Sequence, residues 1–416
     1  MTVASAHTVD PIQLEHRLLE YSNGRSFFAL YSSRGYKSAY SEHTLVFGWG
    51  AQRIFKADDL AAGALEGGWR FGFAGYEMRH RFESLDRGNP ALGDWPEALF
   101  FEPEVVGTLS WDGTLEVHDL VGVEAQNILD TLLQYASKPQ GPTALEFHPV
   151  ESKDQYLSAV QSLKDHIQRG DIYEVNYCTA FKANFKVLNS AALFQKMAER
   201  TDAPFSAYLK LDQHELLCTS PERYLKKEGT TLISQPIKGT SRRLATGNEH
   251  AMEALRSSEK ERAENVMIVD LVRNDLSRVA AKGSVKVSEL YGTYAFKNVN
   301  QLISTVTAEC RAGTTHWDIL KATFPMGSMT GAPKVSAMQL AERYEKTARE
   351  IYSGTVGYTT PSGDFDFNVV IRSVALNRAT GIATTHVGGA ITILSEPLQE
   401  YDECLLKAES MFDSAH

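Results

Sequence analysis

Lys238 is the residue of this chain whose position most favours a chemical role. It lies in the segment Gln235–Thr240 (QPIKGT), between the end of an apolar strand pattern and a glycine, where a side chain can meet a ligand. A lysine amine acts as a nucleophile once it has lost its proton. The alternative is a solvated charge in a turn. Three further segments, at 260–275, 331–334 and 400–407, favour the chemical interpretation.

Two pairs of glutamates lie at helical spacing. Glu261 and Glu264 are three residues apart in one predicted helix, and Glu400 and Glu403 repeat this spacing in another, with Lys407 four residues further on. Carboxylates three residues apart project from the same face of a helix. Two such faces can surround a divalent cation, and because Mg²⁺ takes only one or two carboxylates directly, the others would act through water or on a substrate. Two solvated acidic faces are the alternative.

Two glycine-containing segments and one arginine could bind anions. Gly331-Ala332-Pro333-Lys334 opens a predicted helix, whose N-terminal amides suit an anion. The run Gly388-Gly389-Ala390 would let backbone amides approach a carboxylate. Arg372 lies in a long apolar strand pattern, where a cation needs a partner, and a ligand carboxylate would supply one. The alternatives are simple turns and a structural ion pair.

The elements that must position these residues are mostly strands. Alternating and apolar runs predict strands at 175–187, 205–211, 215–219, 231–237, 298–307, 353–359, 365–375 and 382–393. Periodic runs predict helices at 154–170, 259–276, 334–344 and 397–412. Strand runs outnumber strand–helix–strand alternations, which favours large antiparallel sheets covered by helices in an α+β fold.

Composition excludes several classes of protein. The 416 residues carry a net charge of -10 with no basic block, so nucleic acid is not an expected partner. The four cysteines are widely spaced, which argues against a zinc knuckle or a disulfide scaffold. No signal peptide or membrane-spanning run is apparent, so we expect a cytoplasmic protein without a membrane partner. Residues 138–142 break both patterns and separate a β-rich region, 1–140, from a catalytic domain, 150–416.

Several motifs in order resemble the chorismate-utilising enzymes, and most closely the synthase subunit of aminodeoxychorismate synthase. The resemblance is strong over 150–416 and loose before it. The motifs are GDIY at 170–173, APFSAY at 203–208, SPER at 220–223, PIKGT at 236–240, residues 261–275, 324–334 and 352–358, IRS at 371–373, and residues 400–407. The fold that this implies is a sandwich of two large antiparallel sheets flanked by helices.

The resemblance implies a role for each candidate residue. Lys238 would attack C2 of chorismate while its 4-hydroxyl leaves, and Glu222 would be the general acid beside that hydroxyl. The attack needs a neutral amine, so we expect burial and neighbouring positive charge to lower the pKa of Lys238. Glu264 and Glu403 would contact Mg²⁺, assisted by Glu261 and Glu400. The residues implied to hold the substrate are Gly239, Thr240, Tyr352, Arg372, Gly388, Gly389, Ala390 and Lys407.

Differences among members of the resembled family indicate which of the family's reactions this chain would catalyse. Anthranilate synthases have alanine at the position of Lys238, and enzymes that use water carry a lysine where this chain has Glu174. Three residues depart from the family pattern: Gln301 replaces a histidine, Ala390 ends the glycine triplet, and Leu394 replaces an aspartate. The alternatives are an anthranilate synthase component I and a non-catalytic relative.

The expected product is 4-amino-4-deoxychorismate, a precursor of 4-aminobenzoate and folate. No cysteine lies in a context typical of a glutaminase nucleophile. Ammonia would therefore come from solution or from a separate glutamine amidotransferase subunit, and a separate enzyme would release 4-aminobenzoate.

Overall fold

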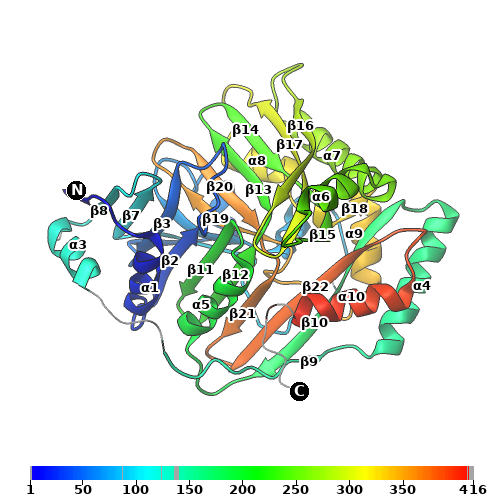
Figure 1. The fold of residues 1–416 in the computed structure, drawn as a ribbon, viewed down its shortest axis with the longest axis horizontal. Helices are drawn as coiled ribbons and strands as arrows, with labels where there is room; N and C mark the ends of the chain where they lie inside the picture. Colours follow the sequence, from blue (N-terminus) through cyan, green and yellow to red (C-terminus); the bar gives the residue numbers. More distant parts are fainter. Residues whose placement is uncertain (1, 87, 123, 135–139, 410, 412–416) are drawn as a thin grey trace.

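The computed structural model describes residues 2–86, 88–122, 124–134, 140–409 and 411. Over these residues the strands form two large antiparallel sheets, of 12 and 10 strands, with helices along their outer faces (Figure 1). The predicted α+β class and the two antiparallel sheets are therefore confirmed. No helix of the described part is long and apolar enough to cross a membrane.

The larger sheet runs in the order β1-β8-β7-β3-β2-β11-β12-β21-β22-β10-β18, and β9 pairs with β10. The bounds of these strands are β1 Thr2–Ala6, β2 Phe27–Ser32, β3 His43–Trp49, β7 Val105–Ser110, β8 Leu115–Asp119, β9 His148–Pro149, β10 Glu174–Asn184, β11 Phe205–Leu211, β12 His214–Ser220, β18 Gly331–Ala332, β21 Ser373–Asn377 and β22 Ile382–Ile391.

The smaller sheet runs in the order β15-β17-β14-β13-β20-β19-β5-β6-β4, and β16 pairs with β17. Its strands are β4 Arg53–Lys56, β5 Arg70–Ala74, β6 Ala98–Glu102, β13 Arg223–Glu228, β14 Thr231–Gln235, β15 Ile237–Arg242, β16 Lys286–Ala295, β17 Val299–Glu309, β19 Thr355–Thr359 and β20 Phe365–Val369.

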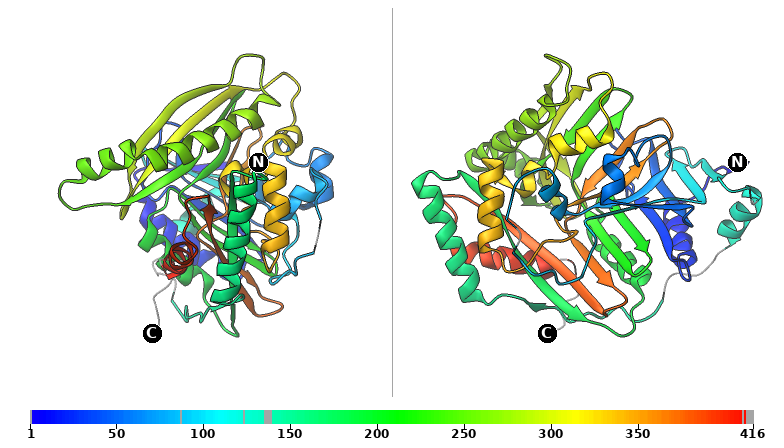
Figure 2. Two further views of the ribbon diagram at one scale, coloured as in Figure 1. Left: turned by 90° about the vertical axis from the view of Figure 1, so that its right-hand side faces the viewer. Right: turned by 180° about the vertical axis from the view of Figure 1, so that it is seen from behind.

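Helices cover the sheets on several sides. Helix α7 packs on β15 and β17, α10 packs on β22, and α4 and α9 pack on β10, where they lie beside one another (Figure 2). The helices are α1 Pro11–Tyr21, α2 Ala57–Ala61, α3 Ala125–Gln134, α4 Lys153–Arg169, α5 Ser190–Thr201, α6 Asn248–Ser257, α7 Glu259–Ser277, α8 His316–Thr323, α9 Lys334–Tyr344 and α10 Pro397–Glu409, with 3-10 turns at Tyr76–Arg81 and Gly327–Met329.

The periodicity of apolar residues predicted the bounds of several helices and strands closely. Helix α4 ends where Gly170 adopts a left-handed conformation, with φ of 84°, and Ser152 with Gln155 forms a capping box at its start. The predicted bounds of β11 and α9 coincide with the observed ones. In α10, the predicted end at Phe412 lies outside the described residues.

Two predicted strands are each broken into two, and both breaks position candidate residues. The run 231–237 divides at Pro236 into β14 and β15, because proline has no N–H for the ladder. The run 365–375 divides into β20 and β21, which belong to different sheets. An apolar run buried on both faces does not reveal where a chain leaves one sheet for another.

Strands from the first part of the chain belong to both sheets. Strand β2 pairs with β11 in the larger sheet, and β5 pairs with β19 in the smaller one. Residues 138 and 139 of the predicted boundary lie outside the described residues. The division into regions 1–140 and 150–416 stays a prediction.

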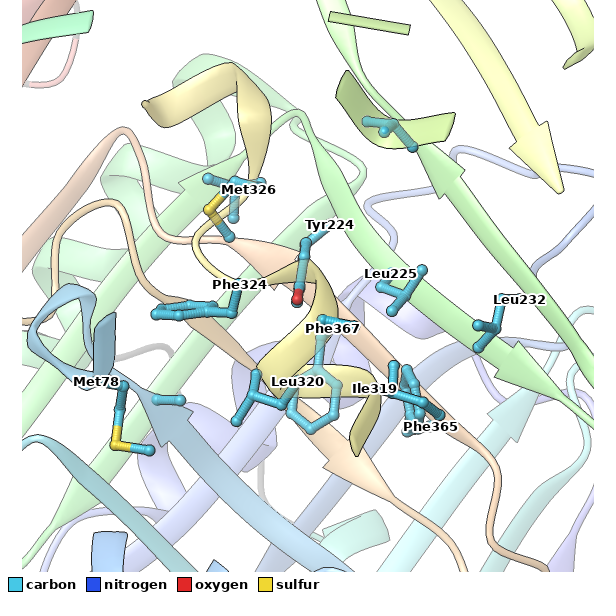
Figure 3. Packing of buried hydrophobic residues seen from close by; sticks show 14 of the residues in the cluster. Met78, Tyr224, Leu225, Leu232, Ile319, Leu320, Phe324, Met326, Phe365 and Phe367 are labelled. Carbon is cyan, nitrogen blue, oxygen red and sulfur yellow. The ribbon is translucent and has the colours of Figure 1, made fainter. Parts of the chain in front are cut away.

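A hydrophobic cluster fixes the start of β13. Figure 3 shows side chains of β13, β20 and α8 packed together, among them Tyr224, Ile319 and Phe367. Tyr224 is buried, and its hydroxyl lies 2.5 Å from the hydroxyl of Thr323 in α8. This packing holds the residue two positions before Tyr224, which is Glu222.

Candidate active site

The candidate residues meet where two neighbouring chain segments cross from one sheet to the other. One segment joins β12 to β13 through Glu222, and the other joins β20 to β21 through Arg372. The backbone N–H of Val369 donates to the carbonyl of Glu222 at 3.0 Å, and that of Thr219 donates to the carbonyl of Arg372 at 3.0 Å. These hydrogen bonds hold the two crossings side by side.

Glu222 has the properties of a general acid at neutral pH. It is 5% exposed, and burial raises its pKa to about 7, even though the neighbouring Ser328 hydroxyl, Lys238 and the amide of Ile237 each favour the ionised form. A carboxyl group with a pKa near the working pH can donate a proton and later recover it. Near pH 7 a large fraction of Glu222 is therefore protonated.

The sequence context of Arg372 predicted that it lies within a strand, but the structure places it outside one. It occupies the crossing between β20 and β21 with a φ of 49°, in the left-handed region that only the surrounding structure can enforce on an arginine. Its half-buried guanidinium forms no hydrogen bond or ion pair with any residue in the described part of the chain, and burial lowers its pKa. A buried cation without a protein partner is suited to a ligand carboxylate.

Lys238 lies in β15 beside a bulge. The pairing register between β15 and β17 shifts between Ile237 and Thr240, and Gly239 has a φ of 92°. An added Cβ at Gly239 would come within 2.8 Å of a carboxylate oxygen of Glu261. Glycine is therefore required both for the backbone conformation and for the close approach of helix α7.

The charge state of Lys238 differs from the prediction. Its Nζ is 3.2 Å from Oε1 of Glu174, and the two side chains are 12% and 2% exposed. Burial acts to lower the pKa of Lys238, but Glu174, Glu264 and Glu222 outweigh it, and the pKa is raised. The predicted neighbouring positive charge is replaced by three carboxylates. In the ligand-free protein Lys238 is therefore an ammonium group.

The four candidate metal ligands come from α7 and α10. Burial raises the pKa of Glu264 and of Glu400, and each has a second glutamate nearby that raises it further. Glu403 is 57% exposed and accepts a hydrogen bond from Lys407 at 2.7 Å; burial acts to raise its pKa, but Lys407 outweighs burial and lowers it. Within the described ranges no three histidine, cysteine or acidic side chains converge closely enough to hold a metal ion.

The surroundings of Glu400 nevertheless fit a cation. An added Cβ at Gly389 would lie 3.1 Å from Oε2 of Glu400, so this carboxylate closely approaches the backbone of β22. Oxygen ligands of this kind are those that Mg²⁺ prefers. The residues present are therefore compatible with Mg²⁺, although their assembly around it stays a prediction.

The other substrate candidates lie around these groups. In β22, Gly388, Gly389 and Ala390 lie opposite Cys178, Tyr177 and Asn176 of β10. Nζ of Lys407 donates to the carbonyl of Gly388 at 2.8 Å, which joins α10 to this strand.

Two further candidates lie nearby, one exposed and one buried. Thr240 is exposed and lies opposite Gln301 of β17. Tyr352 is buried, and its ring stacks on His386 at a centroid distance of 5.3 Å. By contrast, Lys334 forms an ion pair with Asp275 at 2.5 Å, which ties α9 to α7.

Some residues of the site were not predicted from the sequence. Glu174 was noted only because it replaces a lysine, yet it is the residue paired with Lys238. Ser328 and Asn176 also border the site, and Arg349 lies behind them with its side chain 1% exposed. The only signal for Arg349 was its spacing of four residues from Glu345, which on a helix would suggest an exposed ion pair.

Comparison with known proteins agrees with this geometry. A family model described as chorismate binding enzyme matches residues 35–413, and the chain belongs to this family. It is 33% identical to aminodeoxychorismate synthase component 1 of Escherichia coli (strain K12) over 348 residues, which cover 81% of this chain and 74% of that protein. It is 41% identical over 265 residues to the probable chloroplastic aminodeoxychorismate synthase of Oryza sativa subsp. japonica.

The coverage of these relatives is unequal. The matched residues cover 62% of this chain but only 29% of the rice protein, and 32% of the chloroplastic aminodeoxychorismate synthase of Arabidopsis thaliana. Among solved structures, anthranilate synthase component I from Streptococcus pneumoniae TIGR4 superimposes with a TM-score of 0.80 at 23% identity, covering 90% of this chain and 93% of that one. This likeness confirms the fold predicted from the motifs.

Proposed function

We propose that this protein is the synthase subunit of an aminodeoxychorismate synthase, which converts chorismate and ammonia into 4-amino-4-deoxychorismate. The observation that carries the proposal is the placement of one buried amine, Lys238, beside a buried carboxyl group, Glu222, whose pKa is about 7. A nucleophile and an acid in one site are what displacement of a poor leaving group such as hydroxyl requires.

Two displacements account for the reaction. The neutral amine of Lys238 forms a bond to C2 of chorismate, the ring double bond shifts, and the C4–O bond breaks. Glu222 gives its proton to the departing oxygen, which leaves as water. Ammonia then bonds to C4, the double bond returns and the C2–N bond to Lys238 breaks. The proton on the new amine returns to Glu222, so chorismate and ammonia yield aminodeoxychorismate and water.

The first step requires Lys238 to lose its proton. Glu174 is its hydrogen-bonding partner at 3.2 Å, and Oε2 of Glu174 is buried without any partner among the described residues. Glu174 is therefore positioned to accept that proton. The cost of placing charge in this buried site favours the neutral pair over the ion pair once substrate has excluded water.

Substrate binding would use the cations around the crossing. The guanidinium of Arg372, which has no partner among the described residues, suits one carboxylate of chorismate, and Lys407 lies near the strand of Gly388. Tyr352 and Thr240 would border the ring. When bound to Glu264 and Glu403, with Glu261 and Glu400 assisting, Mg²⁺ would neutralise the other carboxylate of the substrate. Ammonia would come from solution or from a separate glutamine amidotransferase subunit, for synthesis of 4-aminobenzoate and folate.

The test is product analysis. Chorismate, Mg²⁺ and an ammonium salt should yield 4-amino-4-deoxychorismate, detected by chromatography and mass spectrometry, whereas glutamine without a partner subunit should yield none. Anthranilate with an equal amount of pyruvate would instead establish an anthranilate synthase, and no consumption of chorismate would indicate a non-catalytic relative.

Glu403→Gln should weaken the binding of Mg²⁺ and, through it, of chorismate. Without ligands the variant should melt close to wild type, because Glu403 is exposed and an ion pair such as Glu403–Lys407 contributes only about 0.3–0.5 kcal/mol. We expect Mg²⁺ plus chorismate to raise the melting temperature of wild type and of Asp402→Asn, the exposed neighbour on the same helix, but to raise that of Glu403→Gln much less. Equal ligand-induced stabilisation in all three proteins would remove Glu403 from the metal site.

A further inference from the structure

A buried network lies behind Glu222, in the turn Gly327–Met329 and its supports. The three successive carbonyls of Ser328, Met329 and Thr330 each accept a hydrogen bond: from Nδ2 of Asn176 at 3.0 Å, from Nη1 of Arg349 at 2.7 Å and from the backbone N–H of Asn176 at 2.8 Å. Two residues, Asn176 and Arg349, therefore hold these three successive carbonyls.

Arg349 and Asn176 are themselves joined. Nη2 of Arg349 donates to the carbonyl of Asn176 at 2.8 Å, and Glu345 accepts from Nε and Nη2 of Arg349 at 3.0 Å and 2.6 Å. Glu345 also accepts the backbone N–H of Cys178 at 3.0 Å, and the guanidinium lies 4.3 Å from the centre of the Tyr76 ring. All these groups are buried. Such a network costs desolvation but specifies one geometry when every member is satisfied.

One polar atom of the turn is not satisfied. The Ser328 hydroxyl is buried and makes no full hydrogen bond with any residue that the structure describes, yet it lies close enough to Glu222 to favour the ionised carboxylate. A buried hydroxyl without a partner costs free energy. Its presence is explained if it forms a hydrogen bond in another state of the protein, such as the one reached during the reaction.

We propose that Glu345 and Arg349 are a positioning pair, which holds the turn so that the Ser328 hydroxyl hydrogen-bonds to Glu222 when that residue gives up its proton. The hydroxyl then stabilises the carboxylate that forms as the 4-hydroxyl of chorismate leaves. This inference rests on the role of Glu222 in the proposed function, but it applies to any product whose formation begins with loss of that hydroxyl.

The test compares pH profiles of chorismate consumption, followed by absorbance whatever product forms. Ser328→Ala should lower kcat about tenfold, the effect of one hydrogen bond to a charged group, while the KM for chorismate changes little. Because the hydroxyl favours the ionised form, its loss should raise the pKa of Glu222 and move the alkaline limb of the kcat profile to higher pH. Ser328→Thr, which keeps the hydroxyl, should show the alkaline limb of the kcat profile at the same pH as wild type.

Two more variants separate positioning from folding. Ser353→Ala removes a hydroxyl that accepts from Nη1 of Arg349 at 3.3 Å but has no part in the contact with Glu222. This variant should leave the alkaline limb of the kcat profile at its wild-type pH. Glu345→Gln should move the limb in the same direction as Ser328→Ala at a pH and temperature where both are folded. An unmoved limb in Ser328→Ala would overturn the proposal. Product analysis of wild type judges the proposed function independently of this result.

Discussion

Replacing Lys238 with alanine is expected to reduce the formation of aminodeoxychorismate by about 10⁴-fold or more, because the covalent route is lost with the nucleophile. The alanine variant should also melt at a lower temperature. Lys238 is the partner of Glu174, whose side chain is 2% exposed, and removal of one member of a buried pair leaves an uncompensated charge.

Lys238→Arg is the cleaner variant for this prediction. It keeps a cation beside Glu174 and Glu264, so the fold and the charge balance are retained, but a guanidinium stays protonated and cannot attack C2. We expect it to bind chorismate, as measured by calorimetry, and to be as inactive as the alanine variant in product assays. Turnover within tenfold of wild type in either variant would exclude Lys238 as the nucleophile.

Replacing Glu222 with glutamine should have the second-largest effect, a loss in kcat of about 10²–10⁴-fold. The amide has nearly the same shape but carries no acidic proton. In wild type, kcat should fall as the pH rises through about 7, because the protonated form of Glu222 is the active one. The glutamine variant should retain a small activity without this alkaline limb.

The ionisation of Glu222 should also make the stability of the folded protein decrease as the pH rises. Because the pKa of Glu222 is raised on folding, the folded state favours the protonated carboxyl, and this contribution is lost as the pH rises towards 7 and above. Glu222→Gln should therefore be at least as stable as wild type at pH 8 in thermal melts. Two results would contradict a buried acid at this position. One is a glutamine variant that is less stable than wild type at pH 8, and the other is a wild-type stability that does not change between pH 6 and 9.

Local patterns revealed much of this architecture. The periodic run 154–170 predicted α4, and the helix ends at Gly170, because glycine readily adopts the left-handed conformation of a C-cap. The carboxylate pairs on α7 and α10 were found from spacing, since three residues bring two side chains to one helix face whatever the fold.

The relations between distant segments could not be found in this way. Arg372 was placed within a strand because its neighbours in Val369–Val374 are mostly apolar, and only the two sheets show that the chain crosses between them there. The pairing of Lys238 with Glu174 joins residues 64 positions apart from two different sheets. Its consequence, a raised pKa where a lowered one was expected, depends on charges that no local pattern contains.

The central claim is that Lys238 forms a covalent bond to the substrate. It is tested most directly by mass spectrometry of the intact wild-type protein after incubation with chorismate and Mg²⁺ in the absence of ammonia. The account predicts a mass gain equal to chorismate minus one water, mapped by peptide fragmentation to Lys238, absent in Lys238→Arg and discharged as aminodeoxychorismate when an ammonium salt is added. An unmodified Lys238 in a preparation that forms aminodeoxychorismate as soon as ammonium is supplied would contradict it.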